Sequence, residues 1–121
     1  MKLRSKDLLG LEHVEPDEIT LILDLARDMK KIVLSNMKRV NYLQGRSVVT
    51  LFYENSTRTR VSFEFAAKYM GAHAVNVAVS TSSVAKGESL IDTGRTLDMM
   101  GTDIVVIRHS QPGAPHLLAR N

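Results

Sequence analysis

The sequence predicts an α/β fold in which a parallel sheet is covered by helices on both faces. Three short apolar runs, at residues 47–53, 75–79 and 104–107, alternate with longer segments of helical periodicity. This βαβαβα order is typical of parallel sheets, because parallel strands need a crossover connection between them. The runs are almost continuously apolar, as expected for strands that are buried on both sides. The 121 residues contain no linker or low-complexity tract, so we expect a single domain.

A long helix is predicted to begin at Pro16 and to precede the first strand. Proline suits the first turn of a helix, and Asp17 and Glu18 complement the positive end of the helix dipole. Lysines follow toward the other end, as far as Lys38. The apolar residues recur at helical spacing and form one stripe that is predicted to be buried: Ile19, Ile22, Leu23, Ala26, Met29, Ile32 and Val33.

The two crossover helices are each predicted to end at a glycine. The first covers residues 57–70 and ends at Gly71, in the manner of a left-handed C-cap. The second covers residues 89–100 and is closed by Gly101, and a last helix follows at residues 113–120. The methionines at the ends of the crossover helices are expected to belong to the core: Met70, Met99 and Met100.

Composition excludes several classes of function. Without cysteine there is no disulfide framework, thiol nucleophile or cysteine-ligated metal, and the four histidines lack the spacing of a metal site. We therefore expect no metal and no cofactor. The chain lacks an apolar signal segment and a run of 18 apolar residues, which predicts a cytoplasmic protein that does not contact membranes. The net charge is +3, but the basic residues are scattered along the sequence and aromatic residues make up only 5%. A small anion is therefore favoured over nucleic acid as the ligand.

The most informative stretch joins the first strand to the next helix. It places three hydroxyls and two guanidiniums in five consecutive residues: Ser56, Thr57, Arg58, Thr59 and Arg60. A helix N-terminus already favours an anion through its unpaired N–H groups and the helix dipole. Ser56 alone would be an ordinary N-cap, but the whole run is too polar for capping and predicts a phosphate or carboxylate site. Arg60 is assigned a structural role, since it can pair with Glu64 one turn later.

Two further segments carry polar side chains to the same edge of the predicted sheet, where ligands bind in open α/β folds. The loop at 80–87 holds several hydroxyls and Lys86, although such a lysine by itself is usually a solvated surface residue. Arg108 ends the third strand, where a guanidinium is costly to bury unless it meets a carboxylate or a ligand. Together with Glu54–Thr59, these segments predict a phosphate-type pocket. The nucleotide-binding sequence Gly-x-x-x-x-Gly-Lys-Ser/Thr is absent.

The stretch after the first strand resembles the signature of the transcarbamoylase family. It reads FYENSTRTR at residues 52–60 and continues with SFE at 62–64. Two other segments are similar to the aspartate carbamoyltransferases rather than to the ornithine branch, namely SSVAKGES at 82–89 and RHSQPGA at 108–114. The resemblance extends over nearly the whole chain. It implies the amino-terminal, carbamoyl-phosphate-binding domain of the catalytic chain.

This resemblance also implies a reaction and a set of site residues. The family transfers the carbamoyl group of carbamoyl phosphate to L-aspartate, giving N-carbamoyl-L-aspartate and phosphate in de novo pyrimidine biosynthesis. By resemblance, Ser56, Thr57, Arg58 and Thr59 hold the phosphate. Thr59 also reaches the carbonyl oxygen, and Arg108 polarises that carbonyl and touches the phosphate. Ser82 and Lys86 would be donated to the adjacent subunit's site, and Glu54 would pair with arginines of a second domain on closure.

The family pattern extends beyond this chain. It continues after Asn121 with another strand, a His-Pro-x-Gln segment and an aspartate-binding domain, so residues 1–121 correspond to an incomplete first half of the two-domain transcarbamoylase fold. The resemblance implies a full-length homotrimer, with or without regulatory chains, while the 121-residue chain alone is expected to be inactive. Two alternatives stay open: a transcarbamoylase for ornithine or another amine, and a non-catalytic fragment that binds phosphate-type anions or only assembles.

Overall fold

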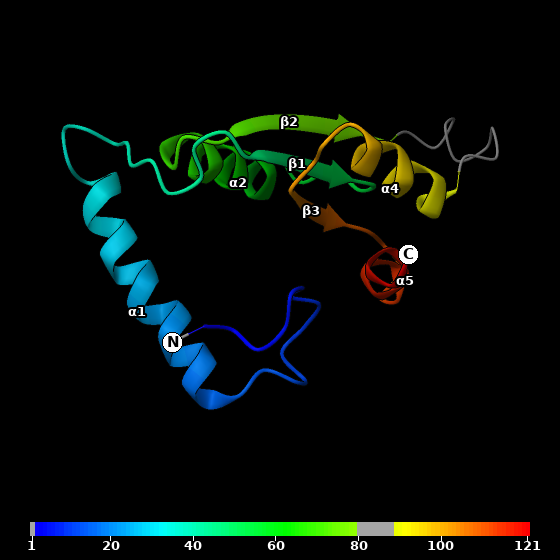
Figure 1. Ribbon diagram of the computed structural model, residues 1–121, viewed down its shortest axis with the longest axis horizontal. Helices are drawn as coiled ribbons and strands as arrows, with labels where there is room; N and C mark the ends of the chain where they lie inside the picture. Colours follow the sequence, from blue (N-terminus) through cyan, green and yellow to red (C-terminus); the bar gives the residue numbers. More distant parts are fainter. Residues whose placement is uncertain (1, 80–88) are drawn as a thin grey trace. The chain divides into compact units, whose positions relative to one another are not determined.

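The computed structural model describes residues 2–79 and 89–121, and the chain divides into two compact units, Met1–Lys38 and Arg39–Asn121 (Figure 1). In the described residues, the first unit contains helix α1 and the second contains the sheet. The elements follow in the order α1 (Pro16–Val33), β1 (Ser47–Phe52), α2 (Thr57–Tyr69), β2 (His73–Ala78), α4 (Leu90–Met99), β3 (Ile104–Arg108) and α5 (Ala114–Arg120). Every strand, and every helix after α1, lies within two residues of its predicted bounds.

Helix α1 is shorter than predicted, because it ends at Val33 and leaves Lys38 outside. Its apolar stripe is not buried throughout as predicted, since Leu23 is 61% exposed. The hydroxyl of Ser35 donates a hydrogen bond to the carbonyl of Ile32 at 2.7 Å. A serine that binds the backbone in this way offers the chain an alternative to continuing the helix. The start is as predicted, with Pro16 in the first turn and the side chain of Glu18 accepting the backbone N–H of Glu15 at 3.0 Å.

The sheet has the order β2-β1-β3, and both pairs of strands are parallel (Figure 1). The register places Val48 beside Ala74 and Ile104, and Phe52 beside Ala78 and Arg108. β1 is therefore the central strand, and all of its residues except Ser47 are buried. The three carboxyl ends lie at one edge, as parallel pairing requires.

Helices cover both faces of this sheet, so the predicted fold class is confirmed. Alternate residues of a strand point to opposite faces. On one face Val48 packs in a buried cluster with Ala67 of α2 and with Ala72. On the other face Val49 and Leu51 form a cluster with Leu97 of α4, and Leu118 of α5 packs against it.

Glycines end the two crossover helices as predicted. Gly71 has φ +83° and Gly101 has φ +86°, values in the left-handed region that other residues rarely adopt. The prediction that Met99 and Met100 are core residues is wrong, since they are 89% and 75% exposed. The buried face of α4 contains Leu97, and Met99, two residues later, projects from the opposite side of the helix. No helix within residues 2–79 and 89–121 is long and apolar enough to cross a membrane.

Candidate functional site at the carboxyl end of the sheet

The candidate site lies where β1 and β3 end side by side. Their parallel register sets Arg108, the last residue of β3, beside Phe52, the last residue of β1. The backbone N–H of Tyr53 donates to the carbonyl of Arg108 at 2.8 Å, which extends the pairing by one residue. The predicted convergence of the turn after β1 with Arg108 is therefore a direct result of strand pairing.

The turn after β1 ends at Ser56, the N-cap residue of α2. Its side chain makes no capping hydrogen bond, and its hydroxyl instead donates to the hydroxyl of Thr59 at 3.0 Å. Thr57 and Arg58 are exposed, and the first turn of α2 contains no acidic residue. A helix N-terminus with exposed donors and no carboxylate of its own has the electrostatic character of an anion site.

Arg60 has the structural partner that its spacing predicted. Its Nη1 atom lies 3.0 Å from Oε1 of Glu64, and both side chains are partly buried. This prediction is confirmed. Since the charge of Arg60 is paired within α2, the exposed cation of the turn is Arg58.

Arg108 also meets a carboxylate of this chain. Its Nε atom lies 3.2 Å from Oε1 of Glu54, and each side chain is 44% exposed. Glu54 is the residue that the resemblance assigned to closure of a second domain. Within the described residues its ion-pair partner is Arg108. The pair is open to solvent, so its net contribution to stability is small.

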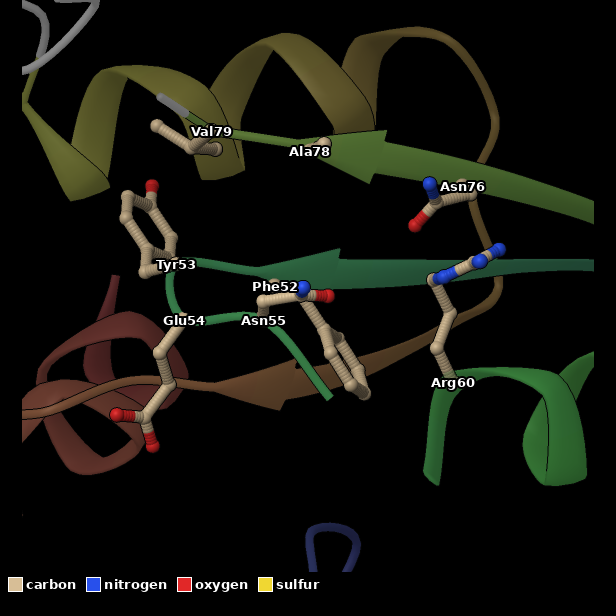
Figure 2. A pocket seen from close by; sticks show the side chains of 8 residues that line it. All are labelled: Phe52, Tyr53, Glu54, Asn55, Arg60, Asn76, Ala78 and Val79. Carbon is tan, nitrogen blue, oxygen red and sulfur yellow. The ribbon is translucent and has the colours of Figure 1, made fainter. Parts of the chain in front are cut away.

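A cavity of about 190 Å³ adjoins the turn, between the carboxyl ends of β1 and β2 (Figure 2). In Figure 2 the side chain of Arg60 extends toward Asn76, while Glu54 points away from Asn76. Asn76 accepts a hydrogen bond from the buried hydroxyl of Thr50 at 3.0 Å, which leaves the amide NH₂ of Asn76 as a donor. The cavity is lined by Phe52, Tyr53, Glu54, Asn55, Arg60, Asn76, Ala78 and Val79.

Sequence reasoning missed two features of this edge. The sequence pattern places Asn76 in a strand and gives it no further role, although Thr50 and Asn76 are polar residues within two apolar strands and are a signal for such a pair. The sequence marks His109 only as a residue typical of one family branch, yet its ring lies against Tyr53, with the ring centroids 4.5 Å apart. Its Nδ1 atom accepts the backbone N–H of Gln111 at 3.0 Å.

Ser82 and Lys86 lie outside the described residues. Residues 2–79 and 89–121 contain no cluster of His, Cys, Asp or Glu side chains that could hold a metal ion. The described part of the candidate site therefore consists of the N-terminus of α2, the side chains of Arg58 and Arg108, and the carboxylate of Glu54.

Comparisons with known proteins identify relatives of this chain. The family model for the carbamoyl-P binding domain of aspartate/ornithine carbamoyltransferase matches residues 6–121. The aspartate carbamoyltransferase catalytic subunit of Acetivibrio thermocellus is 64% identical over 121 residues, which are 100% of this chain and 39% of that protein.

Solved structures agree with the family match. The catalytic subunit of M. jannaschii aspartate transcarbamoylase superposes with a TM-score of 0.82 at 42% identity, covering 96% of this chain and 38% of that one. Aspartate transcarbamoylase from Trypanosoma cruzi, in complex with carbamoyl phosphate, superposes with a TM-score of 0.83 at 36% identity, covering 95% and 37%. The chain thus spans about two fifths of the length of these relatives.

Proposed function

Because the chain belongs to the aspartate/ornithine carbamoyltransferase family, as its carbamoyl-phosphate-binding domain, we propose that it binds carbamoyl phosphate for carbamoyl transfer to L-aspartate. The products are N-carbamoyl-L-aspartate and phosphate, in de novo pyrimidine biosynthesis. The observation that carries the proposal is the juxtaposition of Arg108 with the turn that leads into α2. Aspartate is favoured over ornithine because a relative with 64% identity is named an aspartate carbamoyltransferase.

Each side chain of the turn has a role in binding the substrate. The N–H groups at the start of α2, the hydroxyls of Ser56, Thr57 and Thr59, and the guanidinium of Arg58 donate to the phosphate oxygens. Arg108 approaches from the end of β3 and donates to both the carbonyl oxygen and the phosphate. An anion there replaces Glu54 as the partner of Arg108.

The chemistry needs electrostatic stabilisation more than it needs a nucleophilic side chain. Carbamoyl phosphate is already activated, so the amine attacks its carbonyl carbon directly and phosphate leaves. Negative charge grows on the carbonyl oxygen, where Thr59 and Arg108 donate hydrogen bonds. Loss of one such donor commonly costs about 3 kcal/mol of transition-state stabilisation. Holding the two substrates in attack geometry supplies much of the remainder.

The proposal extends to the assembled protein. The full-length enzyme is a cytoplasmic homotrimer, with or without regulatory chains, and its second domain binds L-aspartate. Ser82 and Lys86 enter the adjacent subunit's site, and Glu54 leaves Arg108 to pair with arginines of the second domain on closure. The family membership of the chain supports these assignments.

Titration of the 121-residue chain with inorganic phosphate and with carbamoyl phosphate tests the site. Arg58→Ala should weaken binding at least tenfold, because a charge-assisted hydrogen bond contributes about 1.5–3 kcal/mol. Arg108→Ala should weaken it in the same direction. Arg95→Ala is the matched control, since it removes an exposed arginine from α4. Equal affinities of wild type and Arg58→Ala, measured by calorimetry, would contradict the site.

Complementation in the full-length chain tests whether the site is shared between subunits. Lys86→Ala and Arg58→Ala should each be nearly inactive as pure proteins. After dissociation, mixing and reassembly, some sites would combine an intact turn from one subunit with an intact loop from another. Partial recovery of activity is therefore expected. Reassembled mixtures without recovery would show that Lys86 does not act in a neighbouring site.

A further inference from the structure

The turn between β3 and α5 is closed by a side chain. Nδ1 of His109 accepts the backbone N–H of Gln111 at 3.0 Å. The carbonyl of Gln111 then accepts the N–H of Ala114, the first residue of α5, at 3.1 Å. The hydrogen bond to the imidazole is therefore one of the bonds that determine the path of the chain after β3.

This bond selects one form of the imidazole. A ring nitrogen that accepts an N–H carries no proton, so this contact requires the tautomer of His109 with its proton on Nε2. The ring of Tyr53 lies against it at 4.5 Å with an interplanar angle of 49°. Aromatic contacts of this kind restrict rotation of both rings. Tyr53 therefore helps to keep Nδ1 directed at Gln111.

The adjacent residue is Arg108, and hydrogen bonds hold both its carbonyl group and the residue that follows it. Its carbonyl accepts the N–H of Tyr53 at 2.8 Å, and the residue that follows it is held by Gln111. The Arg108 side chain is 44% exposed, so packing alone does not restrain its long, flexible stem. The direction of its guanidinium thus depends strongly on the backbone from which it starts.

We propose that His109 is a positioning residue for Arg108, and that it acts by closing the 109–111 turn through Nδ1 with the ring of Tyr53 as its support. The proposal rests on the proposed function in one respect, namely that Arg108 donates to the bound anion. His109 itself touches neither the phosphate nor the carbonyl in this assignment. It reduces the freedom of Arg108 before the ligand arrives.

Two substitutions at His109 separate this role from simple packing. Asparagine places a side-chain oxygen at the same number of bonds from the backbone as Nδ1, so His109→Asn can still accept from Gln111. Glutamine places its oxygen one bond further, near the position of Nε2, so His109→Gln loses the acceptor while keeping a polar amide. Tyr53→Phe keeps the supporting ring, and Tyr53→Leu removes it.

The experiment uses the 121-residue chain with inorganic phosphate as the probe, at about pH 8, where free imidazole is neutral. Calorimetry should give His109→Asn an affinity within about twofold of wild type, and His109→Gln an affinity about fivefold weaker, the effect of one typical hydrogen bond. Tyr53→Leu should weaken binding and Tyr53→Phe should not. Urea unfolding of each variant establishes that the comparison is made between folded proteins.

Nitrogen-15 NMR supplies a readout that needs no ligand. In wild type, Nδ1 of His109 should show the shift of an unprotonated nitrogen, and the Nε–H of Arg108 should be more ordered than in His109→Gln. A protonated Nδ1, or equal order of Arg108 in folded wild type and His109→Gln, would overturn the positioning role. Wild-type affinity of Arg108→Ala would instead overturn the part of the proposed function that concerns Arg108, whatever the NMR result.

Discussion

At the scale of single residues, the site is governed by which group neutralises Arg108. In the described structure that group is Glu54, at 3.2 Å from Nε. An exposed pair of this kind contributes at most about 1 kcal/mol. A phosphate at the N-terminus of α2 carries more charge than a carboxylate and gains the helix N–H groups as well. In the proposed site, Glu54 is therefore a weak competitor that a bound anion would displace.

Glu54→Gln should raise the affinity for inorganic phosphate about two- to threefold, because it frees Arg108 and removes a negative charge from the site. Glu64→Gln is the matched control, since it makes the same change of charge but frees Arg60 instead. Calorimetry at low salt measures both. A larger gain for Glu64→Gln than for Glu54→Gln would contradict competition at Arg108.

At the scale of elements, the N-terminal arm is tied to the first turn of α1 by charge. Nη2 of Arg4 lies 2.9 Å from Oδ2 of Asp17, and the backbone N–H of Arg4 donates to Oε2 of Glu18 at 2.8 Å. Glu18 is only 4% exposed. The Arg4 guanidinium holds the pKa of Asp17 below its usual value, and the backbone N–H groups of Arg4 and Glu15 lower the pKa of Glu18.

The attachment of this arm should depend on pH in a direction that these shifts determine. A carboxyl whose pKa is lowered in the folded state contributes stability above its ordinary pKa, and that stability is lost as pH falls through the lowered value. The ordinary values are 3.8 for Asp17 and 4.5 for Glu18, so the arm should stay attached at neutral pH and detach in acid, below these values.

The amide resonance of Arg4, followed by NMR from neutral to acid pH, measures the detachment. Glu18→Gln should already have a mobile arm at neutral pH, because the neutral amide is a weaker acceptor than a carboxylate. Asp24→Asn is the control, since the ion-pair partner of Asp24 within the described residues is the exposed Arg27 of α1, at 3.9 Å. An Arg4 resonance that is unaffected by Glu18→Gln would refute the electrostatic attachment.

At the scale of the whole molecule, the sheet has two open edges in the described part of the chain. Among the described residues, β2 and β3 each pair with β1 alone. Apolar side chains on both edge strands are exposed, with Val75 at 54% and Ile104 at 40%. Open edges beside uncovered apolar groups favour pairing with other chains.

The 121-residue chain should therefore self-associate as its concentration rises, and it should show no measurable carbamoyl transfer to aspartate. Sedimentation velocity of wild type, Ile104→Lys and Val75→Lys identifies the responsible edge, because a lysine on an edge strand opposes pairing. An assay for carbamoyl aspartate in the same samples tests turnover. A monodisperse, active monomer would contradict both expectations.

Much of this fold was predictable from the sequence, because the patterns that determine its strands and helices are local. Apolar runs of strand length, helical periodicity and the glycines at 71 and 101 depend on neighbours within a few residues, and the strands and the helices after α1 are found where these rules place them. The Arg60–Glu64 pair follows from the spacing of one helical turn. The convergence of the turn at Ser56 with Arg108 needed only the rule that the carboxyl ends of parallel strands meet.

Other features were decided only by the tertiary structure. Periodicity shows which residues are apolar, but the choice of β1 as the central strand depends on how whole faces pack against α2, α4 and α5. The partner of Arg108, the contact of Tyr53 with His109 and the exposure of Met99 all depend on that arrangement. The physical reason is that these groups are far apart along the chain or differ only in the direction they face. Their contacts therefore exist only after the strands have paired and each helix has turned one side toward the sheet.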